Sequence, residues 1–160
     1  MGRVEQMICI QEYILNKYNE MTDYYLGINL DTYFYILEEN IDKCIKKSDL
    51  IVKIDDYNEL KNILIEINIL SALKLNRTNI KEIQNIGLEL FKKKNNDYGD
   101  AFAKYGIIGI IIRMVDKINR ILSLYKNECK CVEESMNDTL LDLHNYSAMG
   151  LMLILLNKKI

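Results

Sequence analysis

The sequence contains no proline, one histidine and only seven glycines among its 160 residues. Because proline and glycine most often interrupt regular structure, their scarcity predicts long helices joined by few tight turns. Lysine and arginine nearly balance aspartate and glutamate, which leaves a net charge of −2. The chain therefore lacks the excess of positive charge that is typical of nucleic-acid-binding proteins, and no direct nucleic-acid partner is expected.

No long apolar run is present either. The longest nearly uncharged stretch, residues 144–156, is too short to span a bilayer, and the opening MGRVEQMICIQEYIL lacks the apolar segment and cleavage site of a signal peptide. A length of 160 residues with 49% hydrophobic and 28% charged residues suits one domain that can bury a core. We expect a cytoplasmic protein without membrane contact.

The cysteines, which are Cys9, Cys44, Cys129 and Cys131, do not have the spacing of a zinc site. Only the last two are close together, and such a site needs a second pair or partnering histidines, whereas the sequence offers His144 alone. We therefore expect free buried thiols in a reducing compartment.

Apolar residues recur every three or four positions along almost the whole chain, which is the periodicity of amphipathic helices. Asp31 and Asn79 stand where helix N-caps are expected, and Glu82 completes a capping box with Asn79. Residues 49–56 are the only strand-like interval and are predicted to be a linker. The expected helices cover residues 4–20, 32–47, 56–75, 79 to the lysine run at 92–94, 100–126 and 132–157. The sequence predicts an all-α bundle of five or six helices.

The predicted helix over residues 106–126 carries a narrow charged stripe on an otherwise apolar surface. This stripe, called here the charged seam, consists of Arg113, Asp116, Lys117 and Arg120, whose steps of three and four place them on one face. One interpretation is a solvated face with Arg113–Asp116 and Asp116–Arg120 ion pairs. The other is a functional site, because isoleucines cover most of the remaining surface and indicate a buried helix, in which charges need partners.

The last predicted helix carries Glu134, Asp138 and Asp142 at four-residue intervals, called here the acidic ladder. Three carboxylates on one helix face repel one another, so a positive partner is expected nearby. The charged seam can supply part of that charge. A divalent cation that prefers oxygen ligands, Mg²⁺ or alternatively Mn²⁺, can supply the rest. The alternative is an acidic face exposed to solvent.

Three blocks in the second half of the chain resemble one protein family. They are KNNDYGDAF (94–102), RMVDKINR (113–120) and ESMNDTLLDLHNY (134–146). Over residues 83–156 the chain resembles the nucleotide modification associated domain type 1 family, which is frequent in phage genomes, whereas residues 1–80 resemble no family. This divides one compact domain into an N-terminal helical part, 1–80, and a nucleotide modification associated region, 81–160.

That family is similar to the all-α MazG and dimeric dUTPase nucleoside triphosphate pyrophosphatases, which hold Mg²⁺ with E-x-x-E and E-x-x-D motifs. The resemblance implies a MazG-like bundle in which Glu134 and Asp138 take the place of the second motif. Asp116 or Asp142 is predicted to supply a further metal ligand.

The first of those motifs is missing, because the chain has Arg113 and Asp116 where two glutamates are expected. The chain instead offers Arg113, Lys117 and Arg120, which are predicted to act as catalytic cations that offset charge developing on the phosphates. The similarity to these pyrophosphatases implies a homodimer or a higher homo-oligomer.

In this context the stretch KKKNNDYGDAFAKYG (92–106) is predicted to form a lip over a nucleotide. Lysine can pair with a phosphate, asparagine amides can bind a base edge or a sugar hydroxyl, tyrosine can stack on a base, and glycine allows the chain to turn. For Asp97, capping the next helix is an alternative to a ligand role. The predicted nucleotide-binding residues are Lys94, Asn95, Asn96, Asp97, Tyr98, Gly99 and Asn145.

These features predict a Mg²⁺-dependent nucleoside triphosphate pyrophosphohydrolase, or a relative of one, in the modified deoxynucleotide metabolism of a phage or virus. The alternative is a non-catalytic helical module that binds a nucleotide or a partner within a DNA modification or defence system. The missing E-x-x-E motif favours the alternative, and the acidic ladder favours the enzyme. A second acidic group at Glu38, Glu39 and Asp42 is interpreted as a solvated face.

Replacing Asp138 with asparagine separates two interpretations of the acidic ladder. If the carboxylate holds a metal, Asp138→Asn abolishes metal-dependent nucleotide binding or turnover at little cost in stability, because it relieves carboxylate repulsion. If the carboxylate belongs to a buried ion pair, the same change lowers the unfolding free energy by about 3–5 kcal/mol. Melting temperature and nucleotide affinity measure both effects, and a large loss of stability with unchanged affinity contradicts the site.

Overall fold

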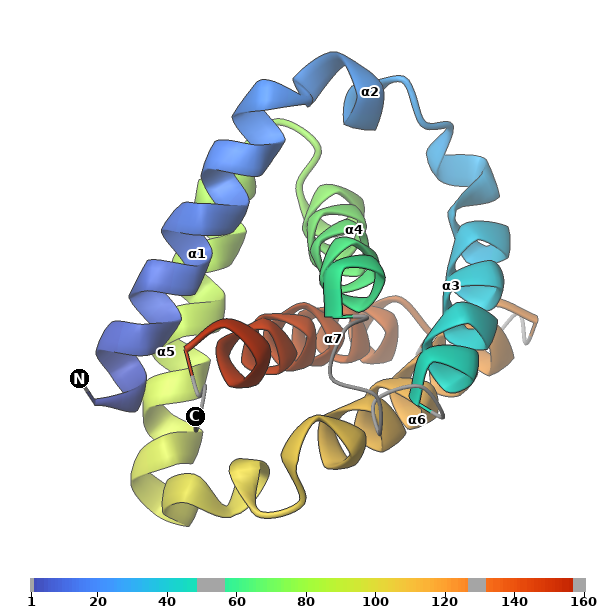
Figure 1. Cartoon of the computed structure of the whole chain (residues 1–160). Coiled ribbons are helices and arrows are strands. Elements are labelled where there is room, and N and C mark those ends of the chain that lie inside the picture. Colours follow the sequence, from blue (N-terminus) through green and yellow to red (C-terminus); the bar gives the residue numbers. More distant parts are fainter. Residues whose placement is uncertain (1, 49–56, 127–131, 157–160) are drawn as a thin grey trace.

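The computed structural model of the chain describes residues 2–48, 57–126 and 132–156, and within these residues it contains helices and no strand. The predicted all-α fold is therefore confirmed (Figure 1). The helices are α1 (Arg3–Glu20), α2 (Thr22–Leu26), α3 (Tyr33–Ser48), α4 (Tyr57–Leu75), α5 (Ile80–Tyr98), α6 (Gly106–Lys126) and α7 (Val132–Leu155), with short 3-10 turns η1 (Leu30–Thr32) and η2 (Gly99–Ala103).

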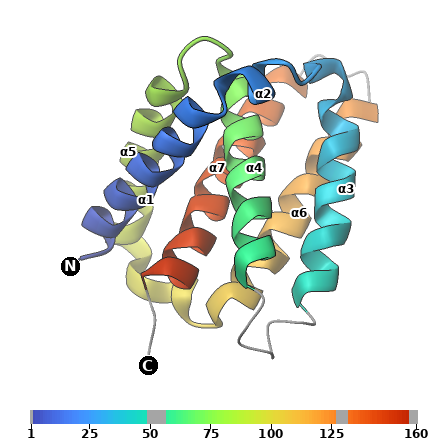
Figure 2. The same cartoon turned by 45° about the horizontal axis from the view of Figure 1, so that its top comes forward.

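Two long helices from opposite halves of the chain form the centre of the bundle. α4 and α7 lie side by side, α1 and α5 pack together on one side, and α3 and α6 pack together on the other (Figures 1 and 2). α4 is buried on nearly every side, with Leu64, Ile67 and Leu70 completely inaccessible. Each such side chain stabilises the fold by about 1.5–3 kcal/mol, so the core includes α4 together with the C-terminal region.

The start of α5 agrees with the predicted N-cap. The side-chain oxygen of Asn79 accepts a hydrogen bond from the backbone N–H of Glu82 at 3.1 Å. The reciprocal half of the capping box is absent, because the backbone N–H of Asn79 donates to Asn76 Oδ1 and the Glu82 carboxylate accepts from Asn76 Nδ2. Asn76 therefore takes the position that the box would have given to Glu82.

The end of α5 and the start of α6 differ from the prediction. α5 continues through the lysine run and ends only at Tyr98, because lysine and asparagine are tolerated in a last helical turn and Gly99, with φ of 58°, is the first residue that leaves the helix. The single helix predicted over 100–126 is divided into η2 and α6, and Gly106, with φ of 63°, lies at the second break. Both breaks require glycine, because other residues are strained at such angles.

Other boundaries lie within a few residues of their predicted positions, with two exceptions. The short helix α2 was not predicted, and the predicted linker 49–56 lies outside the described residues. α3 begins at Tyr33, two residues after the proposed cap Asp31, whose side chain also lies outside the described set.

A layer of polar groups is buried between α4 and α7. The Asn68 side-chain amide donates to the backbone carbonyl of His144 at 2.7 Å, and His144 Nδ1 lies 3.1 Å from the backbone carbonyl of Asn68, to which it donates as the N–H tautomer. Nearby, the Tyr33 hydroxyl and the Ser71 hydroxyl form a hydrogen bond of 3.0 Å. Because one imidazole and one amide each bind the opposite backbone, this layer fixes the register of α4 against α7.

Burial lowers the pKa of His144 from 6.5 to about 4, since the ring is 1% exposed and the charged form loses its hydration. His144 is therefore protonated near pH 6.5 in the unfolded chain but only near pH 4 in the folded chain. The stabilising contribution of the neutral ring is complete above pH 6.5 and is lost as the pH falls toward 4. Over this interval the unfolding free energy is expected to decrease by about 3 kcal/mol.

Urea denaturation of the wild type and of His144→Gln at pH 7 and at pH 4.5 measures this effect. His144 is the only histidine, so the difference between the two pH dependences isolates its titration. The wild type is expected to lose about 2–3 kcal/mol more than the variant over this interval. Equal losses would show that the ring is not protected from protonation by the fold.

Candidate functional site

A cavity of about 370 Å³ lies where the C-terminal end of α5, η2, the first half of α6 and the middle of α7 meet. One part of its wall is aromatic and apolar, and the other part carries amides and charges. It is lined by Phe91, Lys94, Asn95, Tyr98, Gly99, Ala101, Phe102, Arg113, Asp142, Asn145, Tyr146 and Met149. We call it the aromatic cavity.

Helical spacing explains why α5 contributes four of these side chains. Phe91, Lys94, Asn95 and Tyr98 follow one another at steps of three, one and three, which keeps them on a single face of α5. The Phe91 ring is buried and lies edge-on to the Phe102 ring, with centroids 5.9 Å apart. Aromatic pairs prefer this arrangement, so the two rings form a fixed apolar wall.

Two of the predicted binding residues do not belong to this wall. Asn96 and Asp97 are exposed and do not line the cavity, because they lie on the other side of the last turn of α5. Asp97 is inside α5 and precedes Gly99, so the alternative prediction that it caps the following helix is wrong. Lys94, Asn95 and Gly99 do line the cavity.

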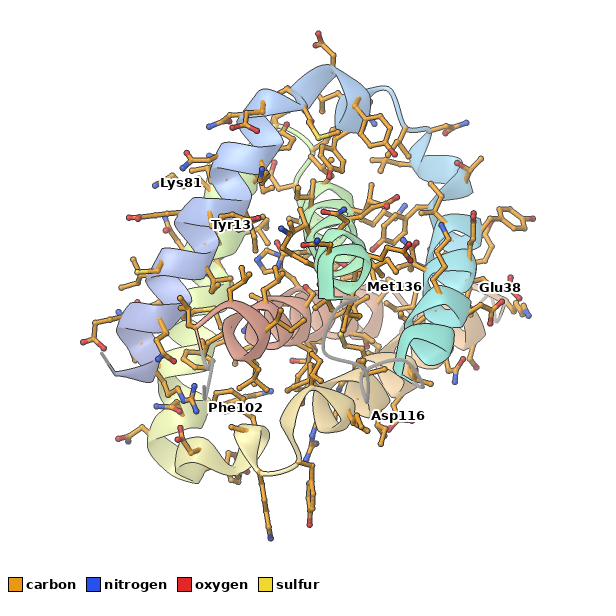
Figure 3. The ribbon with its side chains drawn as sticks, in the orientation of Figure 1. Tyr13, Glu38, Lys81, Phe102, Asp116 and Met136 are labelled. Atoms are coloured by element: carbon orange, nitrogen blue, oxygen red, sulfur yellow. The ribbon has the colours of Figure 1, made fainter. Side chains whose placement is uncertain are left out.

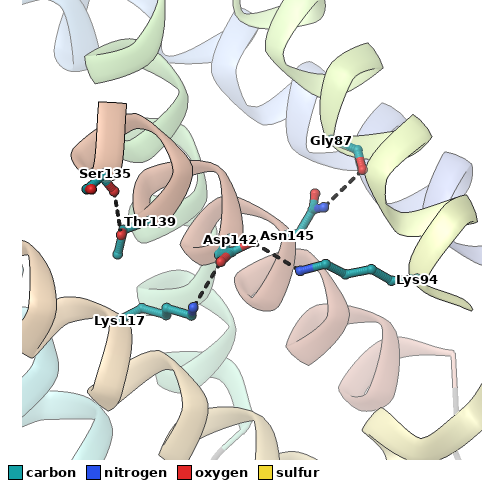
Figure 4. A network of polar contacts seen from close by, with 7 residues as sticks. All are labelled: Gly87, Lys94, Lys117, Ser135, Thr139, Asp142 and Asn145. Atoms are coloured by element: carbon teal, nitrogen blue, oxygen red, sulfur yellow. Dashed lines mark hydrogen bonds and ion pairs between the residues drawn. The ribbon is translucent and has the colours of Figure 1, made fainter. Parts of the chain in front are cut away.

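Asp142 joins three helices through its carboxylate. Lys117 Nζ on α6 lies 2.9 Å from Oδ2, and Lys94 Nζ on α5 lies 3.3 Å from Oδ1 (Figure 4). The Asp142 side chain is 19% exposed, so both pairs are less screened than ordinary surface ion pairs. One member of the acidic ladder is therefore already neutralised by lysines from both sides.

A second cavity of about 420 Å³ adjoins the first. It is lined by the four residues of the charged seam, Arg113, Asp116, Lys117 and Arg120, together with Tyr146. Arg113 and Tyr146 line both cavities. Three cations and one carboxylate surround the second space, which we call the basic cavity.

The face of α6 that carries the charged seam is more open than the sequence predicted. Arg113, Asp116 and Arg120 are exposed, as are Ile108 and Ile112, at 44% and 58%. The expectation of a helix buried almost all round is therefore wrong, because α6 packs mainly against α3, η2 and α7 and leaves one side uncovered by the described residues. Figure 3 shows Asp116 on the outer side of the bundle.

The intrahelical ion pairs of the alternative interpretation do not form. Among the described side chains, no carboxylate oxygen of Asp116 lies within 4.0 Å of a guanidinium nitrogen of Arg113 or Arg120. The two guanidinium groups thus face the basic cavity without an ion-pair partner from this part of the chain. Such groups are suited to bind an anion.

The remaining carboxylates of the acidic ladder do not define a closed metal site. Asp138 is exposed, and the side chain of Glu134 lies outside the described residues. Among the side chains that are described, no group of three or more His, Cys, Asp or Glu residues could hold a metal ion. Neither Asp116 in the basic cavity nor Asp138 on α7 forms an ion pair with a described side chain.

Asn145 lies where α5 and α7 are in close contact. Its side-chain amide donates to the backbone carbonyl of Gly87 at 2.9 Å (Figure 4), and the residue is 6% exposed. The Oδ1 atoms of Asn145 and Asn95 are buried without a hydrogen-bond partner among the described atoms. Asn145 thus has a structural hydrogen bond in addition to its place in the cavity wall.

Two further sequence predictions can be compared with the structure. Glu38, Glu39 and Asp42 are exposed, as expected for a solvated face, and Glu39 pairs with Lys43 at 3.2 Å. Cys9 is a free thiol but is exposed, so the expected burial is wrong for this cysteine. Its neighbours Met7 and Ile10 occupy the buried face of α1 instead.

Several cavity residues were not identified from the sequence, namely Phe91, Phe102, Tyr146 and Met149. A usable signal existed for two of them, because Phe91 stands one turn before Asn95 and Tyr146 follows Asn145 in the third sequence block. Phe102 could not be assigned, since its position depends on the turn that Gly99 introduces.

Gly87→Ala tests how tightly α5 and α7 are packed. A Cβ at this position would lie 2.6 Å from Asn145 Oδ1 and 3.3 Å from His144 Cδ2, so either the buried Asn145 side chain must move or the helices must separate. We expect a loss of about 1–3 kcal/mol in unfolding free energy. Because Asn145→Ala removes the clashing atom, the double variant should lose less than the sum of the two single losses in urea denaturation. Strictly additive losses would contradict the contact.

The match to a known family includes every residue that lines the two cavities except Phe91. Residues 94–154 match the sequence model of a family described as nucleotide modification associated domain 1. No curated protein and no solved structure matches the chain. Within the described residues, no helix has the length and apolar character needed to cross a membrane. The resemblance that the three sequence blocks indicated is therefore confirmed, and residues 94–154 carry the sequence pattern of the nucleotide modification associated domain 1 family.

Proposed function

We propose that this protein binds a nucleotide, with the base in the aromatic cavity and the phosphates in the basic cavity. The observation that carries the proposal is that the two cavities adjoin and share Arg113 and Tyr146. One end of the combined space is apolar and the other is cationic, as are the two ends of a nucleotide. The match of residues 94–154 to a nucleotide modification associated family supports the same conclusion.

The aromatic cavity suits a planar heterocycle. Phe91 and Phe102 provide ring surfaces, and Tyr98, which is 73% exposed, can close over a bound base. The unsatisfied amide oxygen of Asn95 offers an acceptor after a rotation of its side chain. These features fit the predicted roles of Asn95 and Tyr98 in base binding.

The basic cavity suits phosphate oxygens. The guanidinium groups of Arg113 and Arg120 can form paired hydrogen bonds to a phosphate, whereas Lys117 acts as a point charge. Asp142 holds Lys117 and Lys94 in place on the border between the two cavities. In this arrangement Asp142 positions the two lysines, and its carboxylate oxygens are already engaged and thus less suited to bind a metal ion.

The finer form of the proposal is Mg²⁺-dependent pyrophosphohydrolysis of a nucleoside triphosphate in modified deoxynucleotide metabolism of a phage or virus. Mg²⁺ usually takes one or two carboxylates and completes its coordination with phosphates and water, so a closed protein cage is not required. Asp116 and Asp138, with Glu134, are the residues that would hold it, and Mn²⁺ could replace it. When bound, the ion neutralises phosphate charge and activates water. Arg113, Lys117 and Arg120 orient the phosphates and offset their charge.

A non-catalytic nucleotide-binding module is the second candidate, and a specific observation favours it. The carboxylate of Asp142 already accepts from two lysines, and the E-x-x-E motif has been replaced by a cationic seam. Cations in place of carboxylates strengthen phosphate binding but remove metal ligands. Both candidates share nucleotide binding, and only the chemical step distinguishes them.

A cytoplasmic location and a homodimer or higher homo-oligomer remain part of the proposal. The exposed apolar residues of α6 and the residue before it support a second copy of the chain as a partner. Tyr105 is 74% exposed, Ile108 is 44% exposed and Ile112 is 58% exposed. Covering such side chains by another subunit would remove apolar surface from water.

Thermal-shift and calorimetric titrations with deoxynucleoside triphosphates and monophosphates, with and without Mg²⁺, test the proposal. A ligand at one hundred times its Kd should stabilise the wild type by about 2.7 kcal/mol. Arg113→Gln should weaken binding about tenfold or more, because it removes a charged donor shared by both cavities. Lys81→Gln, an exposed charge change at the other end of α5, is the matched control and should bind normally.

The same samples distinguish the two candidates. Release of pyrophosphate by the wild type that is lost in Asp138→Asn supports the enzyme, whereas binding without pyrophosphate release supports the module. A wild type whose melting temperature responds to none of these nucleotides contradicts nucleotide binding altogether.

A further inference from the structure

The segment between α5 and α6 is bounded by two glycines that have left-handed backbone angles. Gly99 has φ of 58° and Gly106 has φ of 63°, and a side chain at either position would meet no atom within 4 Å. The requirement for glycine at these positions is therefore one of backbone conformation and not of space. We call residues 99–106 the glycine-bounded segment.

This segment supplies one side of the aromatic cavity. Gly99, Ala101 and Phe102 line it, and the Phe102 ring packs edge-on against Phe91. Neither boundary glycine has a side chain that could anchor the segment, and no residue of η2 is buried. The conformation of this wall must therefore depend on contacts from elsewhere in the bundle.

A principal contact comes from the N-terminal end of α1. Arg3 Nε donates to Asp100 Oδ1 at 3.0 Å, and Arg3 Nη2 donates to Asp100 Oδ2 at 3.4 Å. The Arg3 guanidinium also lies 5.2 Å from the centroid of the Phe102 ring. A single guanidinium thus binds two residues of the segment, one through its charge and one through the face of a ring.

Arg3 is itself held in position. Its Nη1 donates to Gln6 Oε1 at 2.9 Å one turn along α1, and its side chain is only 15% exposed. Isolated surface ion pairs contribute little, but a largely buried arginine that donates two bonds to one carboxylate has a fixed geometry. Phe102 is consequently held by two side chains from outside the segment, Arg3 and Phe91.

We propose that Arg3 is a positioning residue for the nucleotide site, which holds the glycine-bounded segment in the conformation that forms the aromatic cavity. This inference rests on the nucleotide binding proposed above. It assigns a role in ligand affinity to a residue of α1, far outside the matched residues 94–154. The site then needs both halves of the chain.

The expected size of the effect follows from the population of the binding-competent conformation. When a segment samples other conformations, the apparent Kd rises in inverse proportion to the competent fraction. Loss of the Arg3 contacts should weaken nucleotide binding about fivefold if the competent fraction falls to about one fifth. The charged seam is untouched, so phosphate contacts should remain.

Arg3→Met and Asp100→Asn are the informative variants, because each removes the ion pair. Methionine also retains the apolar part of the arginine side chain. Lys17→Met is the matched control, since it removes a cation of the same helix whose partner, Glu20, lies 3.9 Å away and far from the cavity. Calorimetry with the deoxynucleotide that binds the wild type most tightly gives the Kd. Hydrogen exchange of peptides that cover residues 99–106, without ligand, reports the segment directly.

Both variants are expected to bind about fivefold more weakly, to exchange faster in residues 99–106, and to melt within a few degrees of the wild type. The double variant should be no weaker than Arg3→Met alone, because Arg3→Met already removes the ion pair that Asp100→Asn disrupts. Lys17→Met should match the wild type in every measurement. If Arg3→Met is poorly folded, Asp100→Asn carries the test, because the Asp100 side chain is 64% exposed.

The outcomes separate this inference from the function on which it rests. Wild-type affinity in both Arg3→Met and Asp100→Asn overturns the positioning role and leaves the proposed nucleotide site intact. A general loss of stability with exchange raised throughout the protein also overturns it, because Arg3 would then act on the whole fold. Failure of the wild type to bind any deoxynucleotide overturns the proposed function, and this inference with it.

Discussion

The contact between α4 and α7 is the constraint on which the rest of the structure depends. It joins a helix from the first half of the chain, outside the matched residues 94–154, to a helix that lies almost entirely within them. Asn68 and His144 bind each other's backbone and prevent the two helices from sliding. With its buried face fixed in this way, α7 has only one orientation in which to present its other face to α5 and α6.

That other face explains how a single helix can serve both cavities. Residues Asp142, Asn145, Tyr146 and Met149 recur at steps of three and one along α7 and line the aromatic cavity, and Tyr146 extends into the basic cavity. Asp142 binds cations from α5 and α6, while Asn145 binds the backbone of α5 where Gly87 allows close approach. The polar contacts of the aromatic cavity are thus also the contacts that hold three helices together, so the cavity wall and the packing of the bundle share the same residues.

Helical periodicity was sufficient to predict the all-α class and most helix boundaries. The charged seam and Asp142 were identified because charges at steps of three and four on an apolar helix are conspicuous in a sequence. Periodicity could not show that α6 has an uncovered side, because an isoleucine at 112 has the same pattern whether or not another helix covers it. It also could not place Phe102 or Arg3, whose neighbours depend on two glycine turns and on the packing of α1, features that arise only from the tertiary fold.

The presence of a single histidine has a practical consequence for spectroscopy. The His144 ring faces α4, whereas Asp142 and Asn145, within two residues of it along the same helix, face the aromatic cavity. In a proton NMR spectrum the imidazole of this protein gives one set of ring resonances, which needs no assignment among several histidines. Movement of α7 when the cavity is filled would change the chemical environment of that ring without direct contact between ring and ligand. The core of the bundle therefore contains a natural reporter for events at its surface.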